Sequence, residues 1–422
     1  MGKMDIWYGF ACHGLDMLIS NGVLCFIAQN NWTTSSGARK MRDKIIRDAY
    51  ILQLLDFNDY MIFENADIQT MVMFFVNNKV IDNYVLDYRT LEKGAIKEDM
   101  FALLKKQKRN NITIYKMPII ERSKYANKLL TFSNDGGIFE KIAKNKADLQ
   151  SKELAQGIVF PQDFLDKKGA KKLNNIYPIG TGIFGLSDEE KSTLDLSENE
   201  QYLIKPYYTT EQIHRYYTDP HNSKWLIYTD SSFKKGNSMK RFPHLKIHLD
   251  QFIGIFTSDN KPYGLHRCRN EFFFKGEKII SLRKCVGRPC FSYSDFDCYV
   301  TQTFFSIKSS RWDMKFLTGL LNSKLVAFWL RNKGKMQGSN YQIDKAPLQE
   351  IPLPLASFER QQEIIMWVDE ILAKVQDDIH ANIKEQEDKI DILVYHLYNL
   401  TYDEILIIDP EILITREEYD SV

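Results

Sequence analysis

With 422 residues, a mass of 49.5 kDa, 44% hydrophobic and 26% charged residues, the chain has the composition of a globular protein of about two or three domains. Its apolar runs fall far short of the ~20 residues that a membrane helix needs, and its start lacks the layout of a secretory signal, so we expect a cytoplasmic protein without membrane contact. The net charge of +1 hides an uneven distribution. Residues 231–290 hold 13 Lys and Arg against 4 Asp and Glu, whereas residues 351–422 hold 5 against 17. This polarity indicates a polyanion-binding region followed by a helical appendage, although solvated surfaces of either sign explain the charge equally well.

Helices and short apolar runs alternate in the first part of the chain. Apolar residues recur at helical spacing from residue 7 to 19, and "SNG" (20–22) ends that predicted helix. The continuous run "VLCFIA" (23–28) is typical of a strand buried on both faces. A basic helix follows, and then two more predicted strands, "YILQLLDF" (50–57) and "QTMVMFFV" (69–76). The pattern predicts an α/β sheet that opens on a helix, without a preceding Gly-rich turn from strand to helix.

The rest of the chain has a different pattern of predicted secondary structure. Residues 119–175 are expected to be mixed and largely helical, whereas residues 177–354 favour an α+β, strand-rich domain. Its predicted strands are "KWLIYTD", "FIGIFTS", "NEFFFKG", "CFSYSD" and "QTFFSIK", with one helix over 314–332. After "EIPLP" the tail is predicted to be helical, and apolar residues from 365 to 379 step by three and four. That stripe fits a short coiled coil or a helical hairpin that packs on its own chain.

The cysteines do not indicate a metal site. The six of them form no CxxC pair, and the spacing of His266, Cys268, Cys285 and Cys290 matches no common zinc site. We therefore expect reduced cysteines and no metal.

Three stretches together resemble one family. They are "SNGVLCFIAQNNWTTSSGARKMRDKII", "DFNDYMIFENADIQTMVMFFVNNK" and "LTGLLNSKLVAFWLRNKGKMQGSNYQIDKAPLQEIPLP". In this order they resemble the TaqI-like adenine-specific DNA methyltransferases of restriction–modification systems. The resemblance implies that residues 1–118 are the C-terminal half of a partial Rossmann-like methyltransferase domain. It further implies a TaqI-like target-recognition domain with a helical lead-in over 119–355 and a helical tail over 356–422.

One departure from the family's pattern is as informative as the matches. The family binds S-adenosylmethionine through a Gly-containing strand and loop, and transfers the methyl group at an Asn/Asp-Pro-Pro-Tyr/Phe loop. Neither motif occurs in this sequence. We therefore expect no catalytic residue in this chain and no cofactor binding by the chain alone, as in the C-terminal portion of a methyltransferase from a truncated, split or degraded gene. A missing N-terminal half, or a separate modification subunit, would be its partner and would bring S-adenosylmethionine to the complete enzyme.

The resemblance also implies a stacking role for an aromatic residue at the end of the "TMVMFFV" strand. Enzymes that modify a base flip it out of the duplex and hold it against an aromatic face. Because side chains alternate along a strand, only one of Phe74 and Phe75 can point into such a pocket. We expect Phe75 to do so, because it matches the family's stacking position; both residues being core phenylalanines is the alternative.

Double-stranded DNA is the partner that the recognition domain implies. Lysine and arginine contact phosphates, and a few side chains reach base edges. "SSFKKGNSMKR" (231–241) is predicted to be an exposed basic loop, and Arg283 and Arg288 are predicted to contact bases. The predicted DNA-binding residues are Lys205, Arg215, Lys234, Lys235, Lys240, Arg241, Lys246, Arg267, Arg269, Arg283, Lys284, Arg288 and Lys345.

Two other classes of function bear on the sequence, a DNA-binding specificity subunit and a restriction nuclease. "GSNYQIDKAPLQEIPLP" followed by "ERQQEIIMWVDEILAKV" also resembles the ends of recognition domains in type I specificity subunits, which bind DNA without chemistry. Such a subunit has no use for the α/β strands of residues 1–118. A restriction nuclease lacks support, because no acidic residues and lysine stand in a convincing nuclease arrangement.

Overall fold

The structure, a computed structural model, describes residues 4–33, 35–58, 60–63, 65, 68–92, 94–109, 112–125, 130, 138–144, 146–333, 335–337 and 340–421. The chain divides into two compact units. Unit 1 comprises Met1–Lys144, Phe328–Leu348 and Thr401–Leu413, and unit 2 comprises Asn145–Ala327, Gln349–Leu400 and Ile414–Val422. None of the described helices is long and apolar enough to cross a membrane. The domain boundaries expected at residues 118 and 355 stay a prediction.

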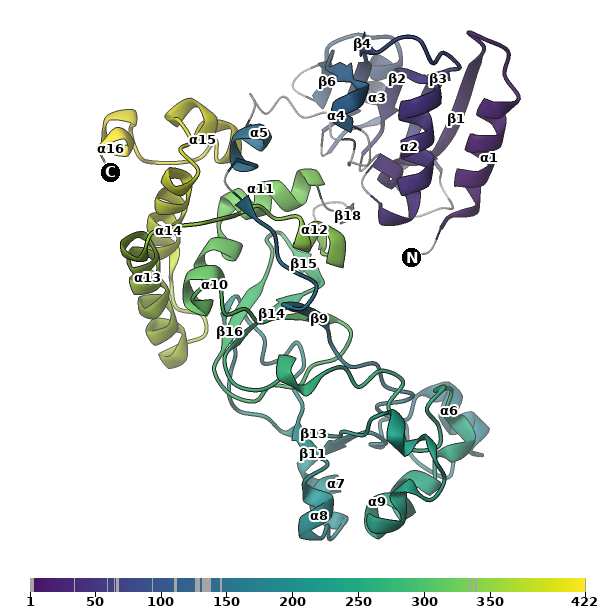
Figure 1. The fold of residues 1–422 in the computed structure, drawn as a ribbon, viewed down its shortest axis with the longest axis vertical. Coiled ribbons are helices and arrows are strands. Elements are labelled where there is room, and N and C mark those ends of the chain that lie inside the picture. The colour runs from purple at the N-terminus through teal and green to yellow at the C-terminus, as the bar shows by residue number, and fades with distance from the viewer. Residues whose placement is uncertain are drawn as a thin grey trace. The chain divides into compact units, whose positions relative to one another are not determined.

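A five-stranded sheet in the order β1-β3-β2-β5-β6 forms the core of unit 1 (Figure 1). Strand β3 runs antiparallel to both β1 and β2, β5 runs parallel to β2, and β6 runs antiparallel to β5. The strands are β1 (Val23–Gln29), β2 (Tyr50–Asp56), β3 (Thr70–Val76), β5 (Asp87–Leu91) and β6 (Thr113–Lys116). The predicted strands of residues 1–118 are confirmed, and the sheet is mixed.

Both faces of this sheet carry helices. Helices α1 (Ile6–Asp16) and α2 (Arg39–Asp48) share one apolar core with the inward side chains of β2 and β3. Helix α3 (Lys97–Leu104) packs on the opposite face, where its buried Leu103 belongs to a smaller core with Leu91 of β5. Each fully buried aliphatic or aromatic side chain contributes about 1.5–3 kcal/mol, so the amphipathic helices and the sheet stabilise one another.

Strand β1 departs from the prediction of burial on both faces. Leu24 and Phe26 turn toward α1, and the Phe26 ring stacks on Trp7 with centroids 5.9 Å apart. On the other face Val23 and Ile27 are 50% and 44% exposed. Among the described strands β1 pairs with β3 alone, so it is an edge strand. The prediction was wrong because an apolar run does not reveal whether a second layer covers the strand.

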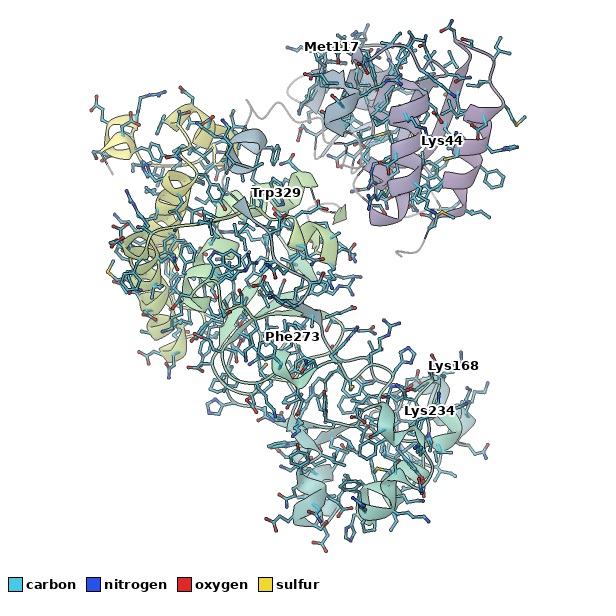
Figure 2. All side chains as sticks on the ribbon, viewed as in Figure 1. Lys44, Met117, Lys168, Lys234, Phe273 and Trp329 are labelled. Carbon is cyan, nitrogen blue, oxygen red and sulfur yellow. The ribbon has the colours of Figure 1, made fainter. Side chains whose placement is uncertain are left out.

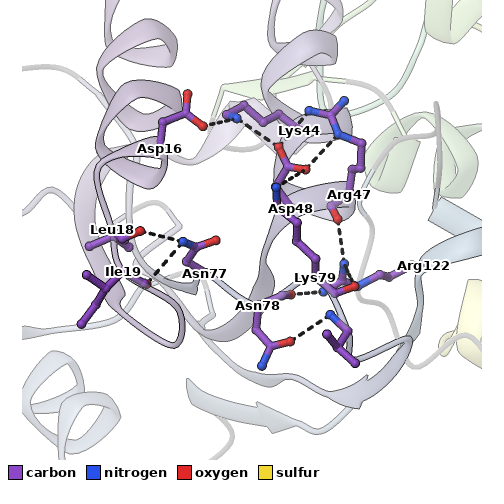
Figure 3. A network of polar contacts seen from close by, with 11 residues as sticks. Asp16, Leu18, Ile19, Lys44, Arg47, Asp48, Asn77, Asn78, Lys79 and Arg122 are labelled. Atoms are coloured by element: carbon purple, nitrogen blue, oxygen red, sulfur yellow. Dashed lines mark hydrogen bonds and ion pairs between the residues drawn. The ribbon is translucent and has the colours of Figure 1, made fainter.

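Polar contacts close the edge of the sheet at which β1 and β2 begin (Figure 3). Asn77, just after β3, donates its Nδ2 hydrogen to the carbonyl of Leu18 at 2.8 Å. Arg122 donates from Nη1 to the carbonyl of Arg47 at 2.8 Å, and the Arg47 side chain holds the pKa of Asp48 down at about 2. The network joins the ends of α1, α2 and β3, so we assign this edge of the sheet a role in stability rather than in ligand binding.

Unit 2 is built on two sheets that share one core. The larger has the order β12-β16-β14-β17-β9, with β12 parallel to β16 and the other pairs antiparallel. The smaller, β10-β13-β11, is antiparallel. The strands are β9 (Leu154–Gln156), β10 (Gly185–Ser187), β11 (Ile204–Pro206), β12 (Tyr216–Tyr217), β13 (Lys224–Ile227), β14 (Lys278–Leu282), β16 (Phe291–Ser294) and β17 (Phe304–Ile307).

Three of the five strands predicted for residues 177–354 are confirmed, as β13, β16 and β17. The other two are wrong: "FIGIFTS" forms the 3-10 helix η6 (Ile253–Ile255) and "NEFFFKG" forms η7 (Glu271–Phe273). Their aromatic residues still face the core, since Phe252 and Phe274 are buried there. The largely helical character expected for 119–175 is also wrong. Among described residues the helices there are α4 (Arg122–Tyr125), α5 (Ile138–Ile142) and α6 (Lys167–Lys172).

The helix predicted over 314–332 is two helices, α10 (Met314–Asn322) and α11 (Lys324–Lys333), because Ser323 has an extended conformation. The tail is helical as predicted, and its α13 (Phe358–Asp377) packs on α10 and on α14 (Lys384–Leu397), which favours the helical hairpin over a coiled coil (Figure 1). A Cβ atom on Gly319 of α10 would lie 2.7 Å from Ile364 of α13, so this close packing requires glycine.

The remaining elements are short. They are η1 (Asn30–Thr33), η2 (Ser36–Ala38), β4 (Asn83–Val85), β7 (Ile119–Glu121), β8 (Lys146–Ala147), α7 (Asp188–Thr193), α8 (Glu198–Gln201), η4 (Ser231–Lys234), η5 (Ser238–Arg241), α9 (Pro243–Asp250), β15 (Lys284–Val286), β18 (Lys335–Gln337), β19 (Asn340–Gln342), α12 (Lys345–Gln349), β20 (Leu353–Pro354), α15 (Tyr402–Ile408) and α16 (Arg416–Asp420).

Candidate nucleic-acid interface

Residues 231–241 of unit 2 form two short 3-10 helices rather than an open loop. We call these residues, which include η4 and η5, the η4–η5 segment. Asp230 caps η4 by accepting a hydrogen bond from the Ser232 amide at 2.8 Å. Met239 is fully buried, and the rings of Phe233 and Phe242 pack with centroids 5.8 Å apart. The apolar side chains therefore anchor the segment to the core and leave its lysines and arginine outside.

Some of the predicted DNA-binding cations already contact other groups within unit 2. A cation held in this way has part of its donors or charge already engaged, so it is less available to a phosphate. The contacts are Lys205 with Glu271 (3.4 Å), Arg215 with Glu387 (2.6 Å), Lys246 with Asp250, Arg269 with the carbonyl of Gly157 (3.2 Å), Arg283 with the carbonyl of Gln302 (3.2 Å) and Arg288 with Glu387 (3.3 Å).

The other predicted cations are exposed, and no ion pair is recorded for them within the described part of the chain. They are Lys234, Lys235, Lys240, Arg241, Arg267, Lys284 and Lys345. Four of these belong to the η4–η5 segment, which its apolar side chains anchor to the core. The structure thus separates cations that are available to a phosphate from cations that already stabilise the fold.

A buried ionic cluster accounts for Arg215 and Arg288. Glu387 of α14 is 7% exposed; its Oε2 accepts a hydrogen bond from Arg288, and its Oε1 forms an ion pair with Arg215. Arg288 also donates to the carbonyl of Asn322 at 2.9 Å. The cluster ties the β15–β16 turn and β12 to the tail helix. The base contacts predicted for Arg283 and Arg288 stay a prediction, and for Arg288 they require this cluster to open.

Asp391 lies one helical turn beyond Glu387 and completes the cluster. Its Oδ1 accepts from the Lys324 amide at 2.7 Å, and its carboxyl is fully buried. Burial raises the pKa of Asp391 to about 7, against the opposing influence of Arg288. The folded protein therefore keeps a proton here at pH values where the unfolded chain, with an ordinary carboxyl pKa near 3.8, has lost it.

This raised pKa predicts a pH dependence of stability. From about pH 4 to about pH 7 the unfolded chain binds fewer protons at Asp391 than the folded chain, so the free energy of unfolding should fall as pH rises. Asp391→Asn keeps the acceptor for the Lys324 amide but cannot ionise. Urea denaturation at several pH values should show a flatter dependence for the variant across this window. The same pH dependence in both proteins would contradict the assignment.

A second cluster of polar side chains lies where β1 and β2 end. Asn30, just after β1, donates from Nδ2 to Oδ1 of Asp56 at the end of β2 at 3.0 Å, and Tyr88 donates to Oδ2 of the same carboxylate at 3.3 Å. Asn31 Oδ1 is buried, and no hydrogen-bond partner for it is recorded in the part of the chain that the structure describes. Ligands of α/β sheets bind outside the carboxyl ends of strands, which makes this the candidate ligand edge of unit 1.

Phe75 does not lie at that edge. Because β3 is antiparallel, its last residues pair with the first residues of β1 and β2: Phe75 lies opposite Leu24 and Ile51. Its side chain is fully buried, and its ring meets Trp32 edge-on at 5.7 Å. A base could stack on this ring only if Phe75 left the core, so the stacking role of Phe75 stays a prediction that its burial does not support. The side chains do alternate as expected, and Phe74 is half-buried on the opposite face.

An aromatic residue that the sequence prediction passed over does lie at the ligand edge. Phe63 belongs to the connection from β2 to β3, which leaves the carboxyl end of β2, and it is 44% exposed. A partial signal was present in the sequence, because Glu64 and Asn65 directly follow this phenylalanine, although Tyr60, Met61 and Ile62 precede it. A planar ring with one free face can stack on a base.

The cysteines and histidine considered for zinc do not gather into a metal site. Within the described residues no group of three His, Cys, Asp or Glu side chains could hold a metal ion. Burial raises the pKa of Cys285 to about 11, which keeps that thiol protonated.

Comparison with known proteins gives one match within unit 1 and one match that lies largely in unit 2. Residues 1–63 match the Eco57I restriction-modification methylase family, and residues 205–353 match the TaqI-like C-terminal specificity domain. The second match contains the η4–η5 segment. The chain is homologous to restriction–modification DNA methyltransferases. The resemblance inferred from the sequence is thereby confirmed.

Relatives of this family cover nearly the whole chain. The Type II methyltransferases M.HindII and M.HincII of Haemophilus influenzae are each 20% identical to it over 95% of its length, which is 75% and 74% of theirs. The fold also resembles that of the Type IIL restriction-modification enzyme MmeI, solved in complex with DNA, with a TM-score of 0.58 and 13% identity. That likeness covers 99% of this chain and 52% of the MmeI chain, so the chain spans about half of the MmeI chain.

Proposed function

We propose that the chain is the DNA-recognition and base-binding part of an adenine-specific DNA methyltransferase of a restriction–modification system. Unit 2 binds duplex DNA, and the ligand edge of unit 1 receives the flipped adenine. The observation that carries the proposal is the η4–η5 segment. Its cations are exposed, have no ion pair recorded with any described residue, and lie within the match to the specificity domain. Lysine and arginine without internal partners can neutralise phosphates at no cost in internal ion pairs.

The double substitution Lys234→Ala and Lys235→Ala should weaken DNA binding in a salt-dependent way. Each neutralised phosphate contributes a slope of about −0.9 to log affinity against log salt, so the slope should become shallower by roughly 2. The loss should be the same for every duplex sequence, because phosphate contacts do not discriminate bases. Fluorescence anisotropy titrations at several salt concentrations measure both quantities.

A matched control separates local contacts from net charge. Lys105 and Lys108 are exposed in unit 1, and no ion pair is recorded for them among the described residues. Lys105→Ala with Lys108→Ala removes the same charge and should leave the slope of the parent protein intact. Equal slopes in the parent and in the Lys234 and Lys235 variant would refute phosphate contact by the η4–η5 segment.

The base-binding part of the proposal rests on Phe63. Phe63 is 44% exposed in the connection that follows β2, and the hydrogen-bonded pair Asn30 and Asp56 at the end of that strand could bind the edge of a base. Stacking on an aromatic ring contributes about 1–3 kcal/mol per base. We therefore transfer the stacking role from Phe75 to Phe63.

The residues present do not fit S-adenosylmethionine. The turn from β1 to α2 is the first strand-to-helix turn described, and buried Trp32 and Ala38 fill it. Cofactor-binding turns of this fold class are instead glycine-rich and open to the ligand. We propose that the cofactor belongs to a partner half of the methyltransferase, and we derive no catalytic step from this chain.

The free edge of β1 is the place where such a partner half would add. Val23 and Ile27 expose apolar surface on this strand, whose outer edge pairs with no strand among the described residues. A strand added to an exposed edge gains main-chain hydrogen bonds and covers apolar side chains, as in β-augmentation. The partner is therefore an α/β domain that supplies a strand.

A non-catalytic specificity subunit is the second candidate. The tail hairpin of α13 and α14 is the feature that favours it. The match of residues 1–63 to a methylase family favours the first candidate, because a subunit that only binds DNA needs no methylase segment.

A further inference from the structure

Helix α6 presents a second cationic surface in unit 2. Its sequence, KKGAKK, buries Gly169 and Ala170 and exposes all four lysines. A Cβ atom on Gly169 would lie 3.0 Å from Leu165 and 3.2 Å from Ile255 of η6, so glycine permits this close approach. Two small residues thus pin a short helix to the core and leave its charged residues in solvent.

The charges of α6 are not balanced within the chain. Lys167 and Lys171, and likewise Lys168 and Lys172, stand four residues apart, a spacing at which like charges destabilise a helix. No ion pair is recorded for any of the four in the part of the chain that the structure describes. Asp166, the nearest carboxylate in sequence, accepts from the Gly169 amide at 2.6 Å as the helix cap. An external anion would relieve this repulsion.

The α6 lysines belong to the same part of unit 2 as the η4–η5 segment. Leu165 and Ala170, at and beside α6, share one apolar core with Met239 of η5 and Ile255 of η6, and Phe233 of η4 packs against it. Figure 2 shows Lys168 and Lys234 at the same end of this unit. The core holds both cationic elements in place, so neither needs to become ordered when an anion binds.

We propose that α6 is a second phosphate-contacting surface of the DNA-binding unit, an inference that rests on the proposed function. Lysine binds phosphate as a point charge and needs no special geometry. Helix α6 contains no aromatic residue, whereas proteins that bind single-stranded nucleic acids stack the bases on aromatic rings. The surface therefore suits the backbone of a duplex.

Two double variants of the full chain test the proposal on a random-sequence DNA duplex. Lys167→Gln with Lys171→Gln, and Lys168→Gln with Lys172→Gln, each remove one i,i+4 pair while keeping a good helix former. At least one double variant should make the slope of log affinity against log salt shallower by roughly 2. Replacing all four lysines with arginine should preserve the slope, because the charges remain. Circular dichroism confirms that the variants are folded.

The outcomes distinguish this inference from the proposed function. If the parent protein binds the duplex and both glutamine variants keep its slope, α6 does not contact phosphate and the inference fails alone. If the parent protein does not bind the duplex at all, the proposed function fails with it. Tighter α6-dependent binding to a single-stranded RNA of equal length would also overturn the inference.

Discussion

Replacing Glu387 with alanine should destabilise unit 2 by about 3 kcal/mol, because it leaves Arg215 and Arg288 without the carboxylate that both contact. Breaking a buried ion pair by removing one partner typically costs about 3–5 kcal/mol, and the partial exposure of the arginines places this cluster at the lower end. Urea denaturation of the parent protein and the variant measures the difference directly.

The same substitution should also alter Asp391. Glu387 is a like charge that raises the pKa of Asp391, so its removal should bring that pKa down and shift the pH dependence of stability to lower pH. Glu387→Gln serves as the control, because it keeps the shape of the side chain and one hydrogen-bond acceptor. A Glu387→Ala variant as stable as the parent would mean that the cluster does not hold the tail helix.

Phe75→Ala should destabilise unit 1 by about 3–5 kcal/mol, the usual cost of truncating a buried phenylalanine. The ring is fully buried and contacts Trp32, so its removal leaves a cavity in the core between the sheet and its helices. Phe63→Ala should cost much less, below about 1 kcal/mol, because that side chain is 44% exposed and belongs to none of the apolar cores recorded for the described residues. Thermal and urea denaturation of the two variants give this comparison.

For methylation activity we expect the opposite ranking: Phe63→Ala should have the larger effect, although Phe75→Ala costs more stability. In an enzyme assembled with its partner half, Phe63→Ala should lose adenine methylation while keeping DNA affinity, because stacking acts on the flipped base and not on the duplex. A Phe75→Ala variant that folds normally but fails to methylate would restore the original assignment to Phe75.

The sequence correctly predicted where the first strands lie and which side chains share one face of a strand. The apolar runs at 23–28, 50–57 and 69–76 are strands, and the alternation of Phe74 and Phe75 between two faces follows from strand geometry. The sequence could not show that β3 runs antiparallel to its neighbours, and this direction moves Phe75 to the opposite edge of the sheet. Strand direction depends on tertiary pairing, which a single run of residues does not encode.

Sequence composition also could not tell exposed lysine and arginine side chains from those that contact other groups within the fold. Composition correctly indicated an exposed basic segment at 231–241, because serine, glycine and asparagine interrupt it. It could not separate Arg288 from Lys234, since the partner of Arg288, Glu387, lies 99 residues away in the chain. The α6 lysines were visible in the sequence but stood outside the most basic window, and only the fold joins them to the η4–η5 segment.

The most direct test of the central claim, that unit 2 binds duplex DNA through the exposed cations of the η4–η5 segment and α6, is hydrogen–deuterium exchange of the full chain with and without a DNA duplex. The claim predicts that DNA slows amide exchange in η4 and η5 and in the helix α6, and that high salt abolishes this protection. The acidic tail helix α13 should exchange at the same rate in both states. Protection confined to the tail, or no change anywhere in unit 2 when DNA is bound, would contradict the claim.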